Sequence, residues 1–70
     1  MRRTIEIVIN GEPRSVPEEQ TIEALVSDLE LPNERIAIEL NRRIVRKSDW
    51  PMTHVTEGDR IEIVHFVGGG

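Results

Sequence analysis

The spacing of the apolar residues changes twice along the chain, and this change restricts the folds that the sequence can adopt. Over residues 4–9 every second residue is an isoleucine, which is the period of a β-strand with one buried face. Over residues 22–29 the apolar residues recur at intervals of three and four, which is the period of an amphipathic helix. Alternation returns at residues 36–40 and at 60–67. The pattern predicts a sheet with one helix.

The first turn is predicted to be a tight hairpin. Asn10-Gly11 follows the first strand at once, and this dipeptide tolerates the positive φ angles of a two-residue turn. The returning strand passes through residues 14–16 and stops near Pro17. Pro13 predicts that this strand lies at an edge of the sheet, because proline has no N–H to donate to a further neighbour.

The predicted helix has recognisable ends. Thr21 is the candidate N-cap, and its hydroxyl can accept a hydrogen bond from a backbone N–H of the first turn. Negative charges close to the positive end of the helix come from Glu18, Glu19 and Glu23. Pro32-Asn33 ends the helix and turns the chain. A helix of about ten residues, roughly 15 Å long, can cover one face of a small sheet.

Three further strands are predicted in the second half of the chain, at residues 36–40, 44–45 and 60–67. Asn41-Arg42 is a turn candidate after the first of them, and Glu57-Gly58-Asp59 turns the chain into the last. Residues 48–56 show no regular period. Trp50 lies in this stretch, and we interpret it as a lid on the edge of the core in preference to a residue that stacks on a ligand.

The order of elements is therefore two strands, a helix and three strands. A right-handed crossover through the helix places the first and last strands parallel and central in the sheet. We predict an α+β fold of the ubiquitin-like β-grasp type, with a mixed sheet of about five strands and one main helix packed on one face. Residues 1–67 are expected to form this domain, and residues 68–70 a flexible glycine tail.

Composition argues against several classes of function. The 70 residues include no cysteine, and the two histidines lie far apart, so neither a catalytic thiolate nor a metal site is expected. The formal net charge of −4 disfavours a general nucleic-acid binder. A local basic cluster is interpreted as a solvated hairpin in preference to a phosphate-binding patch; it comprises Arg42, Arg43, Arg46 and Lys47. Because there is neither a secretion signal nor an apolar run of about 20 residues, a cytoplasmic protein without a membrane segment is expected.

Three glycines, Gly68, Gly69 and Gly70, follow the last strand directly. In extended form they reach about 10 Å beyond the fold, and without side chains they can pass through a narrow channel in a partner enzyme. The carboxylate of Gly70 is a poor acyl donor until it is activated, for example by transfer of AMP from ATP, after which a sulfur nucleophile can attack it. The glycines can also be interpreted as a frayed end or a remnant of cloning.

The sequence lacks the groups that would carry out this chemistry. It has no phosphate-binding loop, and no nucleophile–base pair or pair of carboxylates stands out at a usable spacing. ATP chemistry and sulfur would therefore come from partners. We expect a substrate and carrier with no bound cofactor, not an enzyme; the alternative is a non-catalytic binding module with a flexible glycine end.

Several short segments occur together in an informative order. They are Ala37-Ile38-Glu39-Leu40-Asn41 with Ile44-Val45, then Ser48-Asp49-Trp50, residues 57–64 and Gly68-Gly69-Gly70. In these segments, and along nearly its whole length, the chain resembles the thiazole-biosynthesis sulfur carrier proteins (the ThiS family) of the thiamin pathway.

This resemblance implies three steps. An E1-like adenylyltransferase adenylates the carrier, a sulfurtransferase or cysteine desulfurase pathway supplies the sulfur of a C-terminal thiocarboxylate, and thiazole synthase receives that sulfur. By position, Gly70 bears the sulfur, while Gly68 and Gly69 thread the partner's active site.

Two other classes of carrier remain as alternatives. One is the small subunit of molybdopterin synthase, a family that often has prolines before its terminal glycines. Val64-His65-Phe66-Val67 contains no proline, which favours the thiamin pathway. The other is a protein-conjugating ubiquitin-like modifier, whose tail would end as an isopeptide on lysine instead of a thiocarboxylate.

Alternation along the last strand also predicts a docking surface. If Ile61 and Ile63 face the helix, Val64 and Phe66 point to the opposite face of the sheet, and Val8 of the neighbouring strand lies on that face too. An exposed apolar cluster marks a partner site. We therefore predict a partner interface at Val8, Val64 and Phe66; the alternative is that loops of the protein cover this face.

Overall fold

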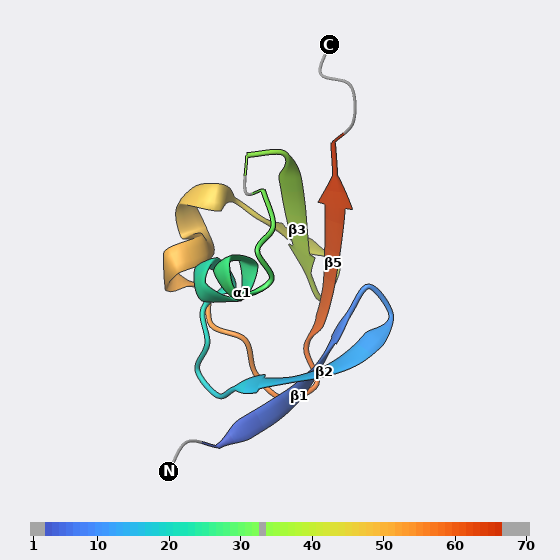
Figure 1. Ribbon diagram of the computed structural model, residues 1–70, viewed down its shortest axis with the longest axis vertical. Helices are drawn as coiled ribbons and strands as arrows, with labels where there is room; N and C mark the ends of the chain where they lie inside the picture. The colour runs from blue at the N-terminus through green and yellow to red at the C-terminus, as the bar shows by residue number, and fades with distance from the viewer. Residues whose placement is uncertain (1–2, 33, 67–70) are drawn as a thin grey trace.

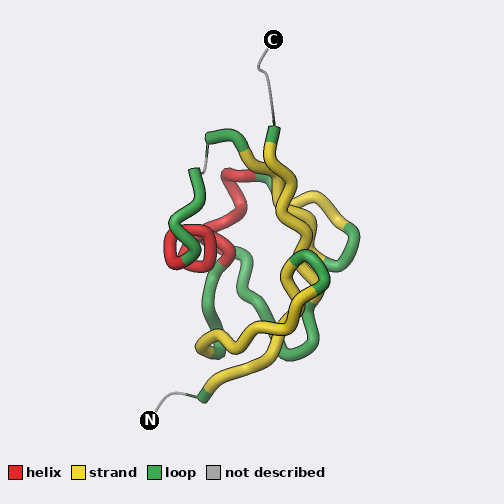
Figure 2. Tube along the Cα trace, turned by 45° about the vertical axis from the view of Figure 1, so that its right-hand side comes forward, coloured by secondary structure: helices red, strands yellow, loops and turns green. Residues whose placement is uncertain are grey.

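A computed structural model of the chain describes residues 3–32 and 34–66. In chain order its elements are β1 (Thr4–Ile9), β2 (Glu12–Pro17), α1 (Ile22–Asp28), β3 (Ile36–Leu40), β4 (Arg43–Val45), the 3-10 helix η1 (Lys47–Met52) and β5 (Arg60–His65). The strands form one sheet, and both helices lie on the same side of it (Figures 1 and 2). The predicted α+β arrangement, a mixed sheet with one main helix on one face, is confirmed.

The strand order in the sheet is β2-β1-β5-β3-β4. β1 and β5 run parallel, whereas β1–β2, β3–β4 and β3–β5 are antiparallel. The crossover through α1 therefore brings the first and last strands side by side, with β5 at the centre of the sheet. β2 is an edge strand, as Pro13 predicts.

Both hairpins turn through two residues with positive φ. These are Asn10 and Gly11, at 49° and 85°, and Asn41 and Arg42, at 51° and 71°. Turns of this kind match the right-handed twist of the strands that they join, and asparagine tolerates the left-handed region better than most residues. The predicted turns at Asn10-Gly11 and Asn41-Arg42 are confirmed.

The helix begins where predicted and ends earlier. The Thr21 hydroxyl accepts a hydrogen bond from the Ala24 N–H at 3.0 Å, so Thr21 is the N-cap. α1 has seven residues, not about ten, because Glu30 adopts a positive φ of 57°. Its N–H bonds to the Ser27 carbonyl, and the Leu31 N–H bonds to the Val26 carbonyl, the two hydrogen bonds of a Schellman motif. This motif stops the helix before Pro32.

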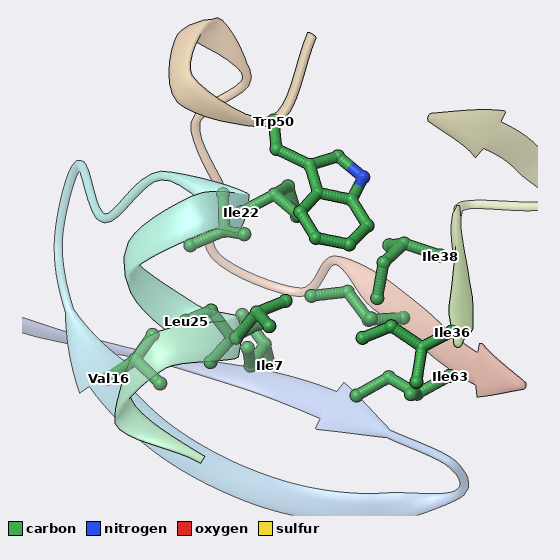
Figure 3. Packing of buried hydrophobic residues seen from close by; sticks show 11 residues of the cluster. Ile7, Val16, Ile22, Leu25, Ile36, Ile38, Trp50 and Ile63 are labelled. Carbon is green, nitrogen blue, oxygen red and sulfur yellow. The ribbon is translucent and has the colours of Figure 1, made fainter. Parts of the chain in front are cut away.

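One apolar core lies between the sheet and the helices. Its buried members from the sheet include Ile7, Ile38 and Ile61, and α1 contributes Ile22, Leu25 and Val26. Figure 3 shows the Trp50 ring beside Ile22 and Ile38. Trp50 is only 3% exposed, and its indole N–H donates to the Val45 carbonyl at 3.1 Å.

The packing of Trp50 supports its interpretation as a lid on the core. We predicted no regular structure for residues 48–56; residues 48–52 belong to η1, whereas residues 53–56 belong to no helix or named strand. The lack of a hydrophobic period in this stretch did not reveal the helix, because a 3-10 helix of six residues is too short to establish such a period.

β5 ends at His65, and Phe66 is the last residue that the structure describes. The predicted strand of residues 60–67 is therefore too long, since it already ends before Phe66; Val67 and the predicted tail at residues 68–70 lie outside the described residues. Among the residues that are described, no helix is long and apolar enough to cross a membrane.

Candidate functional site

β5 places its side chains alternately on the two faces of the sheet. Ile61 and Ile63 point into the core, with exposed fractions of 0% and 9%. Glu62, Val64 and Phe66 are exposed and point the other way. We call this side, which faces away from α1, the open face. The predicted positions of Val64 and Phe66 relative to the core are confirmed, while their use as an interface stays a prediction.

Exposed apolar side chains gather on the open face toward the end of β5. Val64 is 46% exposed and Phe66 59%. Ala37 of β3 pairs directly with Val64. Ile44 of β4 is 66% exposed and pairs with Glu39, whose outward direction it shares. Ala37, Ile44, Val64 and Phe66 are the apolar patch, and two of its members, Val64 and Phe66, come shortly before the glycines in the chain.

Val8 lies on the open face but not at the apolar patch. β1 is the neighbour of β5, as predicted, and Val8 is paired with Arg60. Val64 is four residues further along β5, about 13 Å at the rise of a strand. Val8 is also half-buried. The sequence therefore identifies the correct face for all three residues, but the register separates Val8 from Val64 and Phe66.

Charged residues border the apolar patch on the open face. Glu39 and Glu62 are directly opposite each other on β3 and β5. Together with Arg42, Arg60 and Val64 they line a shallow surface hollow. A partner that covers the patch would therefore also meet two carboxylates and two guanidinium groups. Such groups set the orientation and the rate of association more than the affinity.

Two asparagines, one from each hairpin turn, hold β5 from opposite sides. Asn10 Oδ1 accepts from the Ile63 N–H at 2.7 Å, and Asn10 Nδ2 donates to the Ile63 carbonyl at 3.4 Å. Asn41 Oδ1 accepts from the Arg60 N–H at 2.9 Å, and the Asn41 N–H donates to the Arg60 carbonyl at 2.7 Å. The strand that leads to the glycines is thus anchored by both turns.

The described residues offer no site for a metal ion, since no three His, Cys, Asp or Glu side chains among them are grouped for one. His54 lies in an isolated bridge with Thr21, and His65 ends β5. Gly68, Gly69 and Gly70, the residues predicted to carry the chemistry, lie outside the part of the chain that the structure describes.

Sequence reasoning missed three contributors to this region. Asn10 and Asn41 were treated only as turn residues, and Ile44 only as a strand residue. A signal for Ile44 was present, because alternation across Ile44-Val45 leaves one of the two facing away from the core. No comparable signal exists for the asparagines, since their bonds depend on which strand the folded chain brings beside them.

Comparison with known proteins identifies the family. The model of the ThiS family matches residues 7–70. The chain is 40% identical over 50 residues to the sulfur carrier protein ThiS of Bacillus subtilis, covering 71% of this chain and 76% of that protein. It is 42% identical over 66 residues to a thiazole synthase of Paramagnetospirillum magneticum, covering 94% of this chain but only 20% of that protein. The chain thus spans about a fifth of the length of this relative.

A solved structure shares the fold. The crystal structure of the thiamine biosynthesis protein ThiS from Geobacter metallireducens superimposes with a TM-score of 0.84 at 30% sequence identity. The match covers 94% of this chain and all of the other. Both the sequence and the fold therefore agree along almost the entire length, and the chain belongs to the ThiS family.

Proposed function

We propose that this protein is a sulfur carrier of thiamin biosynthesis and that the carboxylate of Gly70 carries the sulfur. The observation that carries the proposal is the extent of the family match, which runs over residues 7–70 and so includes all three glycines. The similarity to a sulfur carrier of Bacillus subtilis supports the same function. The chemistry requires a free carboxylate on Gly70.

Sulfur loading must begin with activation, because the free carboxylate of Gly70 has no good leaving group for a sulfur nucleophile to displace. Attack of the Gly70 carboxylate on the α-phosphorus of ATP releases pyrophosphate and forms an acyl adenylate. A sulfide-equivalent nucleophile then displaces AMP and leaves a thiocarboxylate. An E1-like adenylyltransferase holds the ATP, and a sulfurtransferase or cysteine desulfurase pathway supplies the sulfur. The carrier itself acts as the substrate, not as the catalyst.

The apolar patch gives the partner enzymes a place to bind. Ordering a glycine costs about 1 to 2 kcal/mol of backbone entropy per residue, so threading Gly68 and Gly69 into an active site needs compensating contacts elsewhere. Val64 lies on β5, which the core and two asparagines hold in place, and Phe66 follows the end of that strand. Burial of their exposed side chains supplies such contacts.

Thiazole synthase is the proposed acceptor of the sulfur. A region similar to this chain makes up a fifth of a protein named thiazole synthase, which supports a shared step for the two activities. Val8 lies on the same face as the apolar patch but away from it, so we assign it to the margin of the interface.

Intact mass spectrometry tests the proposal. The protein is incubated with ATP, a sulfide source and the activating enzyme of the same organism, and the mass increment of replacing one oxygen by sulfur is expected at Gly70. A matched chain with one alanine added after Gly70 is expected to gain no sulfur. If both chains gain sulfur, the assignment is contradicted. It is also contradicted if neither chain gains sulfur although the enzyme catalyses ATP–pyrophosphate exchange in the presence of this carrier.

A further inference from the structure

The central strand β5 is supported unequally on its two sides. On the β3 side there are five residue pairs, and a further hydrogen bond of 2.8 Å follows them, from the Phe66 N–H to the Arg35 carbonyl. On the β1 side two residue pairs form, and the second joins Ile9 to Ile61. Within the described part of the chain, the second half of β5 therefore has a neighbouring strand on one side only.

The side chain of Asn10 takes the place of the missing neighbour. β1 ends at Ile9, and Asn10 begins the hairpin turn with a positive φ of 49°. The Asn10 Oδ1 accepts from the Ile63 N–H at 2.7 Å, and its Nδ2 donates to the Ile63 carbonyl at 3.4 Å. Both bonds are partly buried, where a hydrogen bond is electrostatically stronger than it is in water.

These two bonds restrain both peptide groups that flank the Cα atom of Ile63. A peptide group is planar, so its C=O and N–H turn together. The Ile63 carbonyl belongs to the same peptide group as the Val64 N–H, which by alternation points to β3. The peptide group between Ile63 and Val64 is therefore held from both sides, by Asn10 and by β3. The direction of the Val64 side chain follows from the orientation of this group.

The restrained segment carries two of the four residues of the apolar patch. Val64 and Phe66 are 46% and 59% exposed, so packing against the core fixes their side chains only in part. Their positions relative to Ala37 and Ile44, the patch residues on β3 and β4, depend on the backbone of β5. A surface that already has its bound arrangement loses less conformational entropy when it binds.

We propose that Asn10 is a positioning residue for sulfur loading, because its amide keeps Val64 and Phe66 in the arrangement that the activating enzyme binds. This inference rests on the proposed function and gives a part in it to a residue outside the apolar patch. Asn10 acts through Ile63. Its replacement therefore weakens the docking of the carrier and leaves the chemical step of the docked carrier unchanged.

Binding and turnover of an Asn10→Gly carrier test the proposal. Glycine accepts the positive φ of this turn position but has no amide side chain. The Kd for the activating enzyme, measured by calorimetric titration, is expected to rise roughly three- to tenfold, the effect of losing about one hydrogen bond. The kcat for pyrophosphate release at saturating carrier is expected to equal that of the parent. Both are measured at a temperature at which circular dichroism shows the carriers to be folded.

Two further variants separate positioning from stability. Asn10→Asp keeps an acceptor for the Ile63 N–H, the shorter of the two bonds, and is expected to restore most of the affinity. Thr21→Ala is the matched control, because it removes a hydrogen bond of 3.0 Å to the Ala24 N–H at the start of α1, outside β5. It lowers the stability of the fold, but its Kd is expected to stay within about twofold of the parent value.

Hydrogen exchange of single amides in the free carrier tests the physical cause. The Phe66 N–H keeps its own acceptor, the Arg35 carbonyl, in the Asn10→Gly carrier, so faster exchange there reports release of the segment. The Val55 N–H, bonded to the Gln20 carbonyl at 2.8 Å, reports unfolding of the whole domain. Asn10→Gly is expected to accelerate exchange at Phe66 more than at Val55. Equal acceleration at the two amides overturns the inference.

The binding data decide between the remaining outcomes. Equal Kd values for the Asn10→Gly and Thr21→Ala carriers show that Asn10 acts through stability alone, which overturns the inference and leaves the proposed function standing. A lower kcat of the Asn10→Gly carrier at an unchanged Kd also overturns it. If the parent carrier is neither bound nor loaded by the activating enzyme, the proposed function fails and this inference fails with it.

Discussion

The side-chain amide of Asn10 hydrogen-bonds both backbone polar groups of Ile63, 53 residues away in the sequence. The shorter of the two bonds, from the Ile63 N–H to Asn10 Oδ1, is 2.7 Å long. Asn10 also has a positive φ of 49°, so one residue forms the first hairpin turn and holds the central strand. The strand that leads to the glycines is therefore anchored at the point where β1 ends.

Replacing Asn10 tests this anchor. Asn10→Gly keeps a residue that accepts positive φ but removes the amide, so Ile63 loses both partners. The loss of hydrogen bonds to a partly buried backbone is expected to lower the free energy of unfolding by about 1–3 kcal/mol in urea denaturation. Asn10→Asp, which keeps the acceptor for the Ile63 N–H, is expected to lose less. A glycine variant as stable as the parent contradicts the anchoring role.

Thr21 is predicted to contribute through its hydroxyl alone. Thr21→Ala leaves the Ala24 N–H without the acceptor that it has at 3.0 Å, and it is expected to cost about 1 kcal/mol of stability. Thr21→Ser retains the hydroxyl and is expected to remain within a few tenths of a kcal/mol of the parent. Thermal unfolding followed by circular dichroism measures both, and equal melting temperatures for the two variants argue against the cap.

Trp50 is expected to stabilise the fold by both packing and a hydrogen bond. Trp50→Phe keeps an aromatic ring but removes the donor to the Val45 carbonyl and part of the buried volume. We expect a loss of about 1–3 kcal/mol in the free energy of unfolding. The parent's indole fluorescence is absent from the variant, so both proteins are compared by far-ultraviolet circular dichroism in urea. An unchanged midpoint would show that Trp50 lies outside the cooperative core.

The apolar patch is tested by a charge placed on it. Val64→Asp is expected to weaken binding to the activating enzyme roughly tenfold or more, because an interfacial carboxylate loses its hydration without gaining a partner. The fold is expected to persist, since Val64 is 46% exposed. Met52→Asp is the matched control, because Met52 is 69% exposed but belongs to η1 on the other side of the sheet (Figure 1). Calorimetric titration measures both, and equal affinities contradict the patch as an interface.

The length of α1 illustrates the limit of prediction from local sequence. The apolar stripe continues to Leu29, so periodicity alone extends the helix that far. Glu30 ends it instead by adopting the left-handed conformation, which glycine usually supplies at this position. Leu29 and Leu31 both pack against the core. Tertiary packing of the two leucines therefore outweighs the local preference of Glu30.

The sequence by itself determined the five strands and α1, the fold class and the face on which Val64 and Phe66 lie. It could do so because alternation, helical period, turn dipeptides and Pro13 all act through the backbone within a few residues. Only the tertiary structure decided that Val8 lies beside Arg60, that Ile44 joins the apolar patch and that Asn10 bonds Ile63. These relations depend on the register between strands that the crossover brings together, and that register is set by packing across the whole core.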